Sequence, residues 1–231
     1  MLPEAEKMAL QATPAYPVTD WDAYAELFAA VTTSVQLAVY REAAGHLTGA
    51  VVDCGCGSAK MAPFLATRPP VRSYTGIDGS QAMVTVARRL LARLGNTAFQ
   101  VQQDWIEKVS GNGVYDSAVS IQSYYSWPEP LTVLQAIQRL LVPKGLFVLA
   151  TVNLHLPLEA LIREAEQELA GHPALDAYRE HNRRLAANPG ANFITMDALI
   201  AQVRMAGFRV QEAHQRHFRG GLNFLLLQKG G

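Results

Sequence analysis

The chain has 231 residues, of which 49% are hydrophobic and 17% are charged, a composition that fits one globular domain with a sizeable core and excludes a disordered chain. Its twenty basic and twenty acidic residues cancel, which argues against a nucleic-acid partner held through its phosphate backbone. Two cysteines are too few for a disulfide framework, no apolar run is long enough to span a bilayer, and the acidic N-terminus lacks the basic region of a signal peptide, so we expect a cytoplasmic protein.

An amphipathic segment comes first along the chain. Thr19 and Asp20 can cap a helix, and one stripe of that helix carries Trp21, Tyr24, Leu27, Phe28, Val31 and Val35. Apolar residues at this spacing indicate a helix that packs on the rest of the domain. We predict a helical cover over about residues 19–45, which either closes over a ligand or only covers the sheet.

A glycine-rich loop follows the first strand. Val51-Val52 leads into Asp53-Cys54-Gly55-Cys56-Gly57-Ser58-Ala59, an order typical of a buried parallel strand that ends in a ligand-binding turn. Glycines let backbone amides approach a bound molecule, and a helix over residues 60–66 would point its N-terminus at the same ligand. A glycine-rich turn without a ligand is the alternative.

The spacing of the glycines separates two kinds of nucleotide ligand. A dinucleotide fingerprint needs a third glycine where this chain has Lys60. The spacing acid-x-Gly-x-Gly-x-Gly fits from Asp53 onward, except that its last position is Ala59. Because alanine carries a Cβ, we predict that the φ angle of Ala59 lies below zero.

Strand-like and helix-like segments alternate along the rest of the chain, which predicts an α/β fold around a central, mostly parallel sheet. Strands are expected at residues 72–78, 98–101, 117–121 and 146–152. Helices are expected between Ser80 and Gly95, after Pro128-Glu129-Pro130, and over residues 196–206 with Thr195 as the cap. Strands 208–213 and 223–227 close the chain as an antiparallel hairpin.

An insertion separates the fifth strand from the last helix. It covers about residues 155–192 and contains two amphipathic patterns, one with Leu158, Leu161, Ile162, Ala165 and Leu169, the other with Leu175, Tyr178 and Leu185. Two helices outside the alternating core, placed next to the strand ends, could close over a ligand. We predict a helical lid here.

Acidic residues follow the second and third predicted strands. Asp78 lies where an acid can accept hydrogen bonds from the hydroxyls of a ribose, which NAD and other nucleosides share. Asp104-Trp105 follows the third strand, and the alternatives are a helix N-cap for Asp104 and core packing for Trp105. This edge of the sheet is therefore predicted to bind a nucleoside.

Four features together resemble class I S-adenosylmethionine-dependent methyltransferases of the ubiquinone and menaquinone type. They are the loop from Asp53 to Ala59, the aromatic and Pro-x-Pro segment at residues 122–130, the turn Pro143-Lys144-Gly145 and the closing hairpin. The resemblance covers about residues 45–153 and 193–229. It implies a single domain over residues 1–231, with a Rossmann-like seven-stranded, mostly parallel sheet that ends in an antiparallel hairpin and has helices on both faces.

The resemblance also implies a cofactor and its site. The cofactor would be S-adenosylmethionine, and the binding residues carried over from the family or standing at the strand ends are Asp53, Gly55, Cys56, Gly57, Asp78, Gly79, Met83, Asp104, Trp105 and Gln122. In the family, the acid at Asp104 would take the adenine amine and the residue at Trp105 would pack on the ring.

The methyl acceptor is expected among aromatic residues. The resemblance places Tyr124, Tyr125 and Trp127 towards it, and Tyr24 of the cover is a further candidate. A small, partly apolar or aromatic metabolite fits such a site. Methyl transfer mainly needs alignment and exclusion of water, but an acceptor of high pKa needs a base. The candidates are His155, Tyr124 and Tyr125; for His155 the alternative is a loop histidine without a chemical role.

Other functions stay open at this stage. A cofactor-binding module or a cyclase could use the same fold without moving a methyl group, since methyl transfer has no obligatory side chain. An NAD-dependent oxidoreductase is disfavoured by Lys60 and by the hairpin. We predict no metal site, because strand alternation would send His214 and His217 to opposite faces.

Overall fold

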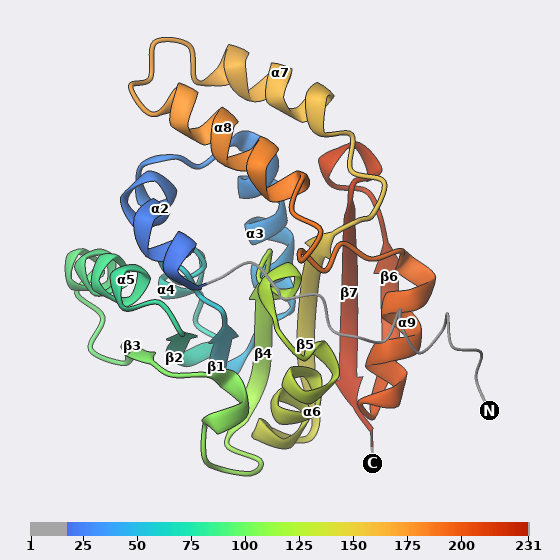
Figure 1. Ribbon diagram of the computed structural model, residues 1–231. Coiled ribbons are helices and arrows are strands. Elements are labelled where there is room, and N and C mark those ends of the chain that lie inside the picture. The colour runs from blue at the N-terminus through green and yellow to red at the C-terminus, as the bar shows by residue number, and fades with distance from the viewer. Residues whose placement is uncertain (1–17, 231) are drawn as a thin grey trace.

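A seven-stranded sheet forms the centre of the molecule (Figure 1). The computed structural model describes residues 18–230, with side chains from Trp21 onward. The strands are β1 Gly49–Cys54, β2 Val71–Asp78, β3 Phe99–Gln103, β4 Tyr115–Ile121, β5 Leu141–Val152, β6 Phe208–His214 and β7 Leu222–Lys229. Their order in the sheet is β3-β2-β1-β4-β5-β7-β6. The first five are parallel, whereas β7 runs antiparallel to both β5 and β6, which confirms the predicted fold.

Helices cover both faces of the sheet, as predicted. They are α2 Val18–Ala30, α3 Ser34–His46, α4 Ala62–Ala66, α5 Gln81–Leu94, α6 Pro130–Leu140, α7 Leu158–Glu168, α8 Leu175–Ala186 and α9 Met196–Met205. One core cluster joins the sheet to α3, α4 and α5, and a second joins its other face to α6 and α9. The remaining helices, α2, α7 and α8, lie above the carboxyl ends of the parallel strands (Figure 1).

Local signals place several helix ends where the sequence predicts them. The Ser80 hydroxyl accepts a hydrogen bond from the backbone amide of Met83 at 3.1 Å, so α5 is capped at its start. At its end Gly95 adopts a left-handed φ of 66°, which glycine tolerates best. The Thr195 hydroxyl caps α9 in the same way through the amide of Ala198, at 3.4 Å.

The N-terminal cover differs from the single apolar stripe that the sequence suggests. Helix α2 ends at Ala30 and α3 begins at Ser34, so Val31 lies in the break between them whereas Val35 lies in α3. The break has a local cause, because the backbone amide of Thr33 donates to Oε1 of Gln36 at 3.0 Å and thereby starts a new helix. The side chains of Thr19 and Asp20, the predicted caps, lie outside the described side chains.

The glycine-rich loop also departs from one prediction. Ala59 has a φ of 59°, so the prediction of a negative angle is wrong. The turn sets this angle, because the amide of Ala59 donates to the Cys56 carbonyl at 2.8 Å and the amide of Ala62 donates to the Ala59 carbonyl at 3.0 Å. A left-handed alanine costs about 1–2 kcal/mol. As a result, regular helix begins only at Ala62 rather than at Lys60.

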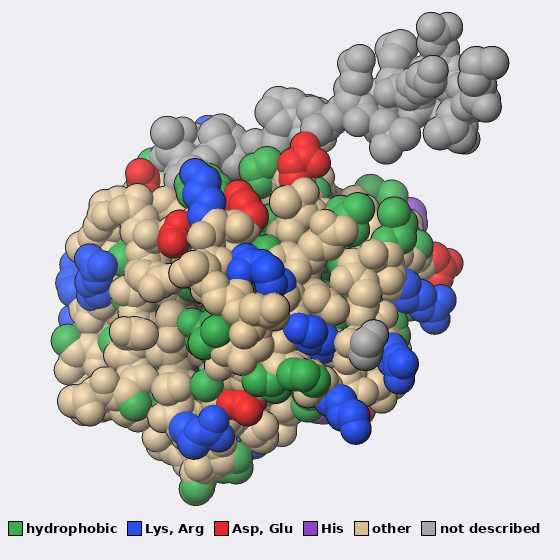
Figure 2. Space-filling model, turned by 90° about the horizontal axis from the view of Figure 1, so that it is seen from below, with side chains coloured by type: hydrophobic (Ala, Val, Ile, Leu, Met, Phe, Trp, Pro, Cys, Tyr) green, Lys and Arg blue, Asp and Glu red, His purple; other side chains and the backbone are tan. Residues whose placement is uncertain are grey.

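The face of the molecule opposite α7 and α8 is mixed in character. Seen from below, basic, acidic and hydrophobic side chains are interspersed over the described part of this surface (Figure 2). Within residues 18–230, no helix has both the length and the apolar character needed to cross a bilayer.

Candidate functional site

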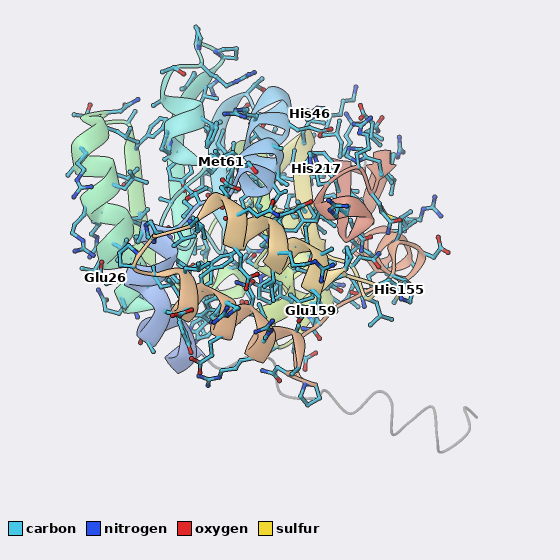
Figure 3. The ribbon with its side chains drawn as sticks, turned by 90° about the horizontal axis from the view of Figure 1, so that it is seen from above. Glu26, His46, Met61, His155, Glu159 and His217 are labelled. Carbon is cyan, nitrogen blue, oxygen red and sulfur yellow. The ribbon has the colours of Figure 1, made fainter. Side chains whose placement is uncertain are left out.

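A large pocket lies at the carboxyl ends of the parallel strands, where open α/β sheets bind ligands. Its floor is formed by the residues that follow each strand: the loop at 55–58 after β1, Asp78 after β2, Asp104 after β3 and Gln122 after β4. Its roof comes from α2, α7 and α8. Seen from above, α7 and α8 lie across the middle of the molecule, over this floor (Figure 3).

The glycine-rich loop and Asp78 are tied together on the floor. The backbone amide of Gly57 donates to Oδ2 of Asp78 at 2.7 Å, and the amide of Ser80 donates to Oδ1 at 2.9 Å. Burial raises the pKa of Asp78, and these two amides oppose that rise. Each carboxylate oxygen has a second lone pair, so the side chain can still accept hydrogen bonds from two hydroxyls in the pocket.

Gly55 allows this loop to pass close to the neighbouring strand end. A Cβ at Gly55 would lie 2.4 Å from the Cβ of Ser123, and the φ of Gly55 is 74°. The thiol of Cys56 also lines the pocket, and burial raises its pKa, so it is protonated at neutral pH.

Asp53 lies beneath the loop rather than in the pocket. Its side chain is 4% exposed, it does not line the cavity, and its Oδ2 accepts a hydrogen bond from the Tyr74 hydroxyl at 2.8 Å. Burial raises its pKa to about 7. Asp53 therefore supports the loop from below, and its predicted contact with a cofactor stays a prediction.

A slot for a flat ring lies at the β3 end of the floor. The Trp105 ring packs over Gly79, where a Cβ would lie 3.4 Å from the ring. Asp104 accepts the backbone amide of Trp105 at 2.8 Å through Oδ1 and keeps its other oxygen for a ligand. Met83, on the first turn of α5, lines the same part of the pocket. Trp105 is half-buried and faces the cavity, so it is not a core aromatic.

The β1 and β4 side of the floor is polar. Lys60 lines the pocket, and its Nζ donates to the backbone carbonyl of Val31. Gln122 has a left-handed φ of 56°, and its Oε1 lies 3.5 Å from Nε2 of Gln36 on α3. Sequence reasoning included Gln122 but missed Lys60 and Gln36 as pocket residues. The only signal for Lys60 was its place directly after the loop.

Aromatic residues from distant segments form the roof side of the pocket. The Trp21 ring lies 5.2 Å from Phe28, 5.9 Å from Tyr125 and 5.5 Å from His181, measured between ring centroids. His181, on α8, is 1% exposed. Burial, with a smaller contribution from Arg184, lowers its pKa to about 4, so the imidazole is neutral at pH 7. Sequence reasoning missed His181, whose position in the pocket depends on how α8 docks against α2.

Two of the predicted acceptor residues, Tyr24 and Tyr124, lie away from the cavity. Tyr124 is 1% exposed and donates to Oε1 of Gln202 at 2.6 Å, below the pocket. It lies with Tyr125 in a 3-10 turn, η2 Tyr124–Ser126, where three residues make one turn and neighbouring side chains diverge. Consequently Tyr125 and Trp127 line the cavity and Tyr124 does not. Tyr24 accepts a hydrogen bond from Nη1 of Arg184 at 2.7 Å, also outside the lining.

His155 is not placed as a base. It is exposed on the loop after β5 and does not line the cavity, and Figure 3 places it at the margin of the molecule. Its backbone amide donates to Oδ1 of Asn153 at 2.8 Å, a turn that follows the end of the strand.

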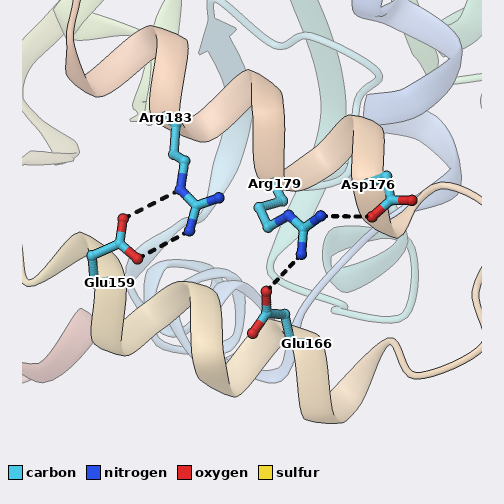
Figure 4. Close-up of polar contacts among 5 residues, drawn as sticks. All are labelled: Glu159, Glu166, Asp176, Arg179 and Arg183. Atoms are coloured by element: carbon cyan, nitrogen blue, oxygen red, sulfur yellow. Dashed lines mark hydrogen bonds and ion pairs between the residues drawn. The ribbon is translucent and has the colours of Figure 1, made fainter.

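The two insertion helices form one unit. Arg183 on α8 contacts both carboxylate oxygens of Glu159 on α7, at 3.3 and 3.1 Å. Arg179 on α8 forms two ion pairs, one with Glu166 on α7 at 3.0 Å and one with Asp176 on its own helix at 2.9 Å (Figure 4). These exposed pairs contribute little to stability, and those of Glu166 and Glu159 join α7 to α8. The unit is fastened to the domain elsewhere, since Glu168 accepts the backbone amide and the hydroxyl of Ser34 at 2.7 and 2.9 Å.

The two histidines of the hairpin contact one carboxylate, contrary to the alternation argument. Nε2 of His214 lies 2.9 Å from Oε1 of Glu42, and Nε2 of His217 lies 2.5 Å from Oε2. Nη2 of Arg216 also contacts Oε1, at 2.7 Å. Strand β6 ends at His214, so alternation no longer governs the direction of His217. No group of three or more metal-ligating side chains is arranged to hold a metal ion within the described part of the chain.

Comparison with known proteins gives one family. The sequence model of a protein family described as a methyltransferase domain matches residues 27–213 of this chain. The ubiquinone biosynthesis O-methyltransferase of Pseudomonas paraeruginosa is 32% identical over 114 residues, or 48% of each protein. That of Acinetobacter baylyi is 30% identical over 115 residues, also 48% of each protein. The chain spans about half the length of the curated relatives that it matches.

Solved structures share the fold at low sequence identity. A methyltransferase from Aquifex aeolicus, described as SAM-dependent, has a TM-score of 0.62 with 14% identity, covering 92% of this chain and 98% of that one. The cyclase SpnF has a TM-score of 0.63 with 17% identity, covering 85% and 80%. Enzymes of two reaction types therefore use this fold.

Proposed function

Because the chain belongs to the methyltransferase-domain family, we propose that it transfers a methyl group from S-adenosylmethionine to a small, uncharged, partly aromatic acceptor. The observation that carries the proposal is the ordered row of floor residues. Along the sheet order β3-β2-β1 lie the Trp105 slot, the Asp78 carboxylate and the glycine-rich loop, in the sequence that adenine, ribose and a sulfur-bearing chain require.

The residues present fit this cofactor. Asp78 keeps lone pairs for two ribose hydroxyls while the amides of Gly57 and Ser80 hold it in place. The ring of Trp105 leaves a face over Gly79 for adenine, and Asp104 keeps one oxygen for the adenine amine. The bound cofactor would supply an activated methyl group on its sulfonium.

The roof residues support an acceptor without charge. Trp21, Phe28 and Tyr125 present apolar ring faces, and the neutral imidazole of His181 adds no positive charge for an anion. The acidic lining residues on α7 are already engaged, because Glu164 pairs with Arg219 and Glu168 holds Ser34. The names of the curated relatives make a hydroxyl oxygen the acceptor atom to test first.

The protein's own contribution is positioning and exclusion of water. The lid of α7 and α8 covers the pocket, and an apolar roof strengthens alignment between the acceptor and the methyl group by removing competing water. No lysine or arginine other than Lys60 lines the pocket among the described residues. Methyl transfer at this site therefore depends on geometry more than on a charged catalytic group.

Two experiments test the proposal in turn. Calorimetric titration should show micromolar binding of S-adenosylmethionine and S-adenosylhomocysteine, and none of NAD; the opposite pattern overturns the proposal. Incubation with S-adenosylmethionine carrying a labelled methyl group and a panel of phenols, amines and thiols should give a labelled product, with neutral phenols ahead of benzoates. Cofactor binding without any labelled product would instead favour a cyclase or a binding module, the alternatives that the shared fold leaves open.

A further inference from the structure

Lys60 is a partly buried cation without a carboxylate partner in the described part of the chain. Its Nζ donates to the carbonyl of Val31, and none of the ion pairs within residues 21–230 includes it. Burial lowers its pKa to about 8. A buried charge is costly unless it is paired, so the position is suited to an anion supplied from outside the protein.

The nearby acids are engaged with other groups. Asp78 is bound by two backbone amides, and Asp53 is bound by the Tyr74 hydroxyl beneath the loop. On the lid, Glu164 pairs with Arg219, and both oxygens of Glu168 are bound by Ser34. An ammonium group has three donors. Val31 takes one of those on Lys60, which lines the pocket, so two remain for a ligand.

The position of Lys60 along the sheet indicates which part of a ligand it meets. In the order β3-β2-β1-β4 the adenine slot follows β3 and the ribose acid follows β2. The rest of the cofactor must then lie over the ends of β1 and β4. Lys60 follows β1 and Gln122 follows β4, and Gln36 joins Gln122 at 3.5 Å. This polar group lines the pocket next to the glycine-rich loop.

We propose that Lys60 binds the carboxylate of the methionine part of S-adenosylmethionine. The assignment rests on the proposed function. The carboxylate would compensate the charge of the ammonium group, and Val31 would continue to hold the side chain in place at the break between α2 and α3. Lys60 therefore selects for the amino-acid end of the cofactor, while Asp78 selects for its ribose.

The test removes the contact between Lys60 and the carboxylate in two ways, by changing the lysine and by using a ligand without the carboxylate. Decarboxylated S-adenosylmethionine lacks only the carboxylate, so its dissociation constant is compared with that of S-adenosylmethionine by calorimetry. In the unaltered protein the intact cofactor should bind about 10-fold to 100-fold more tightly, as expected for a charge-assisted hydrogen bond. In Lys60→Met this ratio should fall to about 2 or less, because only the intact cofactor loses a partner.

Control variants keep the result interpretable. Lys60→Arg keeps the charge and should retain the preference for the intact cofactor. Lys108→Met removes an exposed lysine outside the pocket and should leave both dissociation constants unchanged. Because the result is a ratio of two ligands on one sample, a partly unfolded fraction of Lys60→Met does not alter it.

The outcomes separate this assignment from the proposed function. Equal loss of affinity for both ligands in Lys60→Met would overturn the assignment. So would an unchanged ratio together with weaker binding of a carboxylate-bearing acceptor, because Lys60 would then serve the acceptor. If the unaltered protein binds decarboxylated and intact cofactor equally, Lys60 is not a carboxylate site although the proposed function stands. If it binds neither, the proposed function itself fails.

Discussion

The floor and the roof of the pocket are built in different ways. On the floor, short turns at strand ends hold the carboxylates of Asp78 and Asp104 through backbone amides. On the roof, helices meet through aromatic rings and exposed ion pairs between side chains, as at Trp21 and His181 or Arg183 and Glu159. The floor is thus fixed by the sheet, whereas the roof depends on the docking of α2, α7 and α8.

This difference separates the two ligands of the proposed reaction. Changes to the floor should affect cofactor binding, and changes to the roof should affect the acceptor. It also predicts that the floor tolerates substitution less well, since its backbone passes close to neighbouring residues. Matched variants of the floor and of the roof test whether each region affects only one of the two ligands.

The largest effect is expected at Gly55. Gly55→Ala places a Cβ 2.4 Å from the Cβ of Ser123 at a φ of 74°, so overpacking adds to the cost of a left-handed alanine. We expect a loss of about 2–5 kcal/mol in the free energy of unfolding, measured in urea. The roof offers a control in Gly171, where φ is 79° but nothing lies within 4 Å of the added Cβ. Gly171→Ala should cost only about 1–2 kcal/mol, and equal losses would contradict the close approach at Gly55.

A smaller effect is expected from Asp78→Asn. The amides of Gly57 and Ser80 use different oxygens of Asp78, and asparagine replaces one of these oxygens by an NH2 donor, so one amide and one ribose hydroxyl lose their acceptor. Affinity for S-adenosylmethionine should fall by about 2 kcal/mol, or roughly 30-fold, in calorimetric titration. Asp116→Asn is the control, because Asp116 binds the amide of Ala50 at the opposite end of the sheet. A comparable loss in Asp116→Asn would show that Asp78 has no special role in binding.

Variants of two tryptophans, Trp105 on the floor and Trp21 on the roof, compare the two regions directly. Trp105→Leu should weaken cofactor binding, whereas Trp21→Leu should raise the KM of the acceptor about 10-fold and leave the Kd of the cofactor within about 2-fold, the scale expected from a lost aromatic contact. Steady-state kinetics with a phenol found in the labelling screen would supply the KM. Should Trp21→Leu weaken the cofactor as much as Trp105→Leu does, the division between floor and roof would be wrong.

The smallest effect is expected at Ala59, within the loop itself. Ala59→Gly relieves a left-handed alanine, which is worth about 1–2 kcal/mol, but it removes a fully buried methyl group worth about 0.8 kcal/mol and adds the chain entropy of glycine, about 0.5–1 kcal/mol. These terms nearly cancel, so the free energy of unfolding should change by less than about 1 kcal/mol. Ala59→Val, which cannot adopt this φ without strain, should be clearly destabilised in the same urea titration. A stable Ala59→Val would contradict the left-handed geometry.

The sequence predicts the floor better than the roof for a physical reason. The loop from Asp53 to Ala59 and the acids after β2 and β3 are local signals, because a turn at a strand end is specified by a few neighbouring residues. Even there the prediction was wrong for the φ of Ala59, since hydrogen bonds within the turn outweighed the preference of alanine.

The roof depends on contacts between segments that are far apart in the sequence. Tyr24 and Arg184 meet across 160 positions, and His181 enters the pocket only because α8 docks beside α2. The direction of Tyr124 depends on a 3-10 turn that periodicity does not reveal. Lys60 was visible in the sequence, but its burial beside Val31 appears only once α2 and α3 are seen to break there.

The central claim, that the floor holds S-adenosylmethionine in a fixed order, is tested most directly by a crystal structure with S-adenosylhomocysteine. The account predicts adenine against Trp105, both ribose hydroxyls on Asp78 and the remaining chain over the glycine-rich loop. Adenine bound beneath Trp21 and Phe28 instead, with Asp78 still held only by backbone amides, would contradict it.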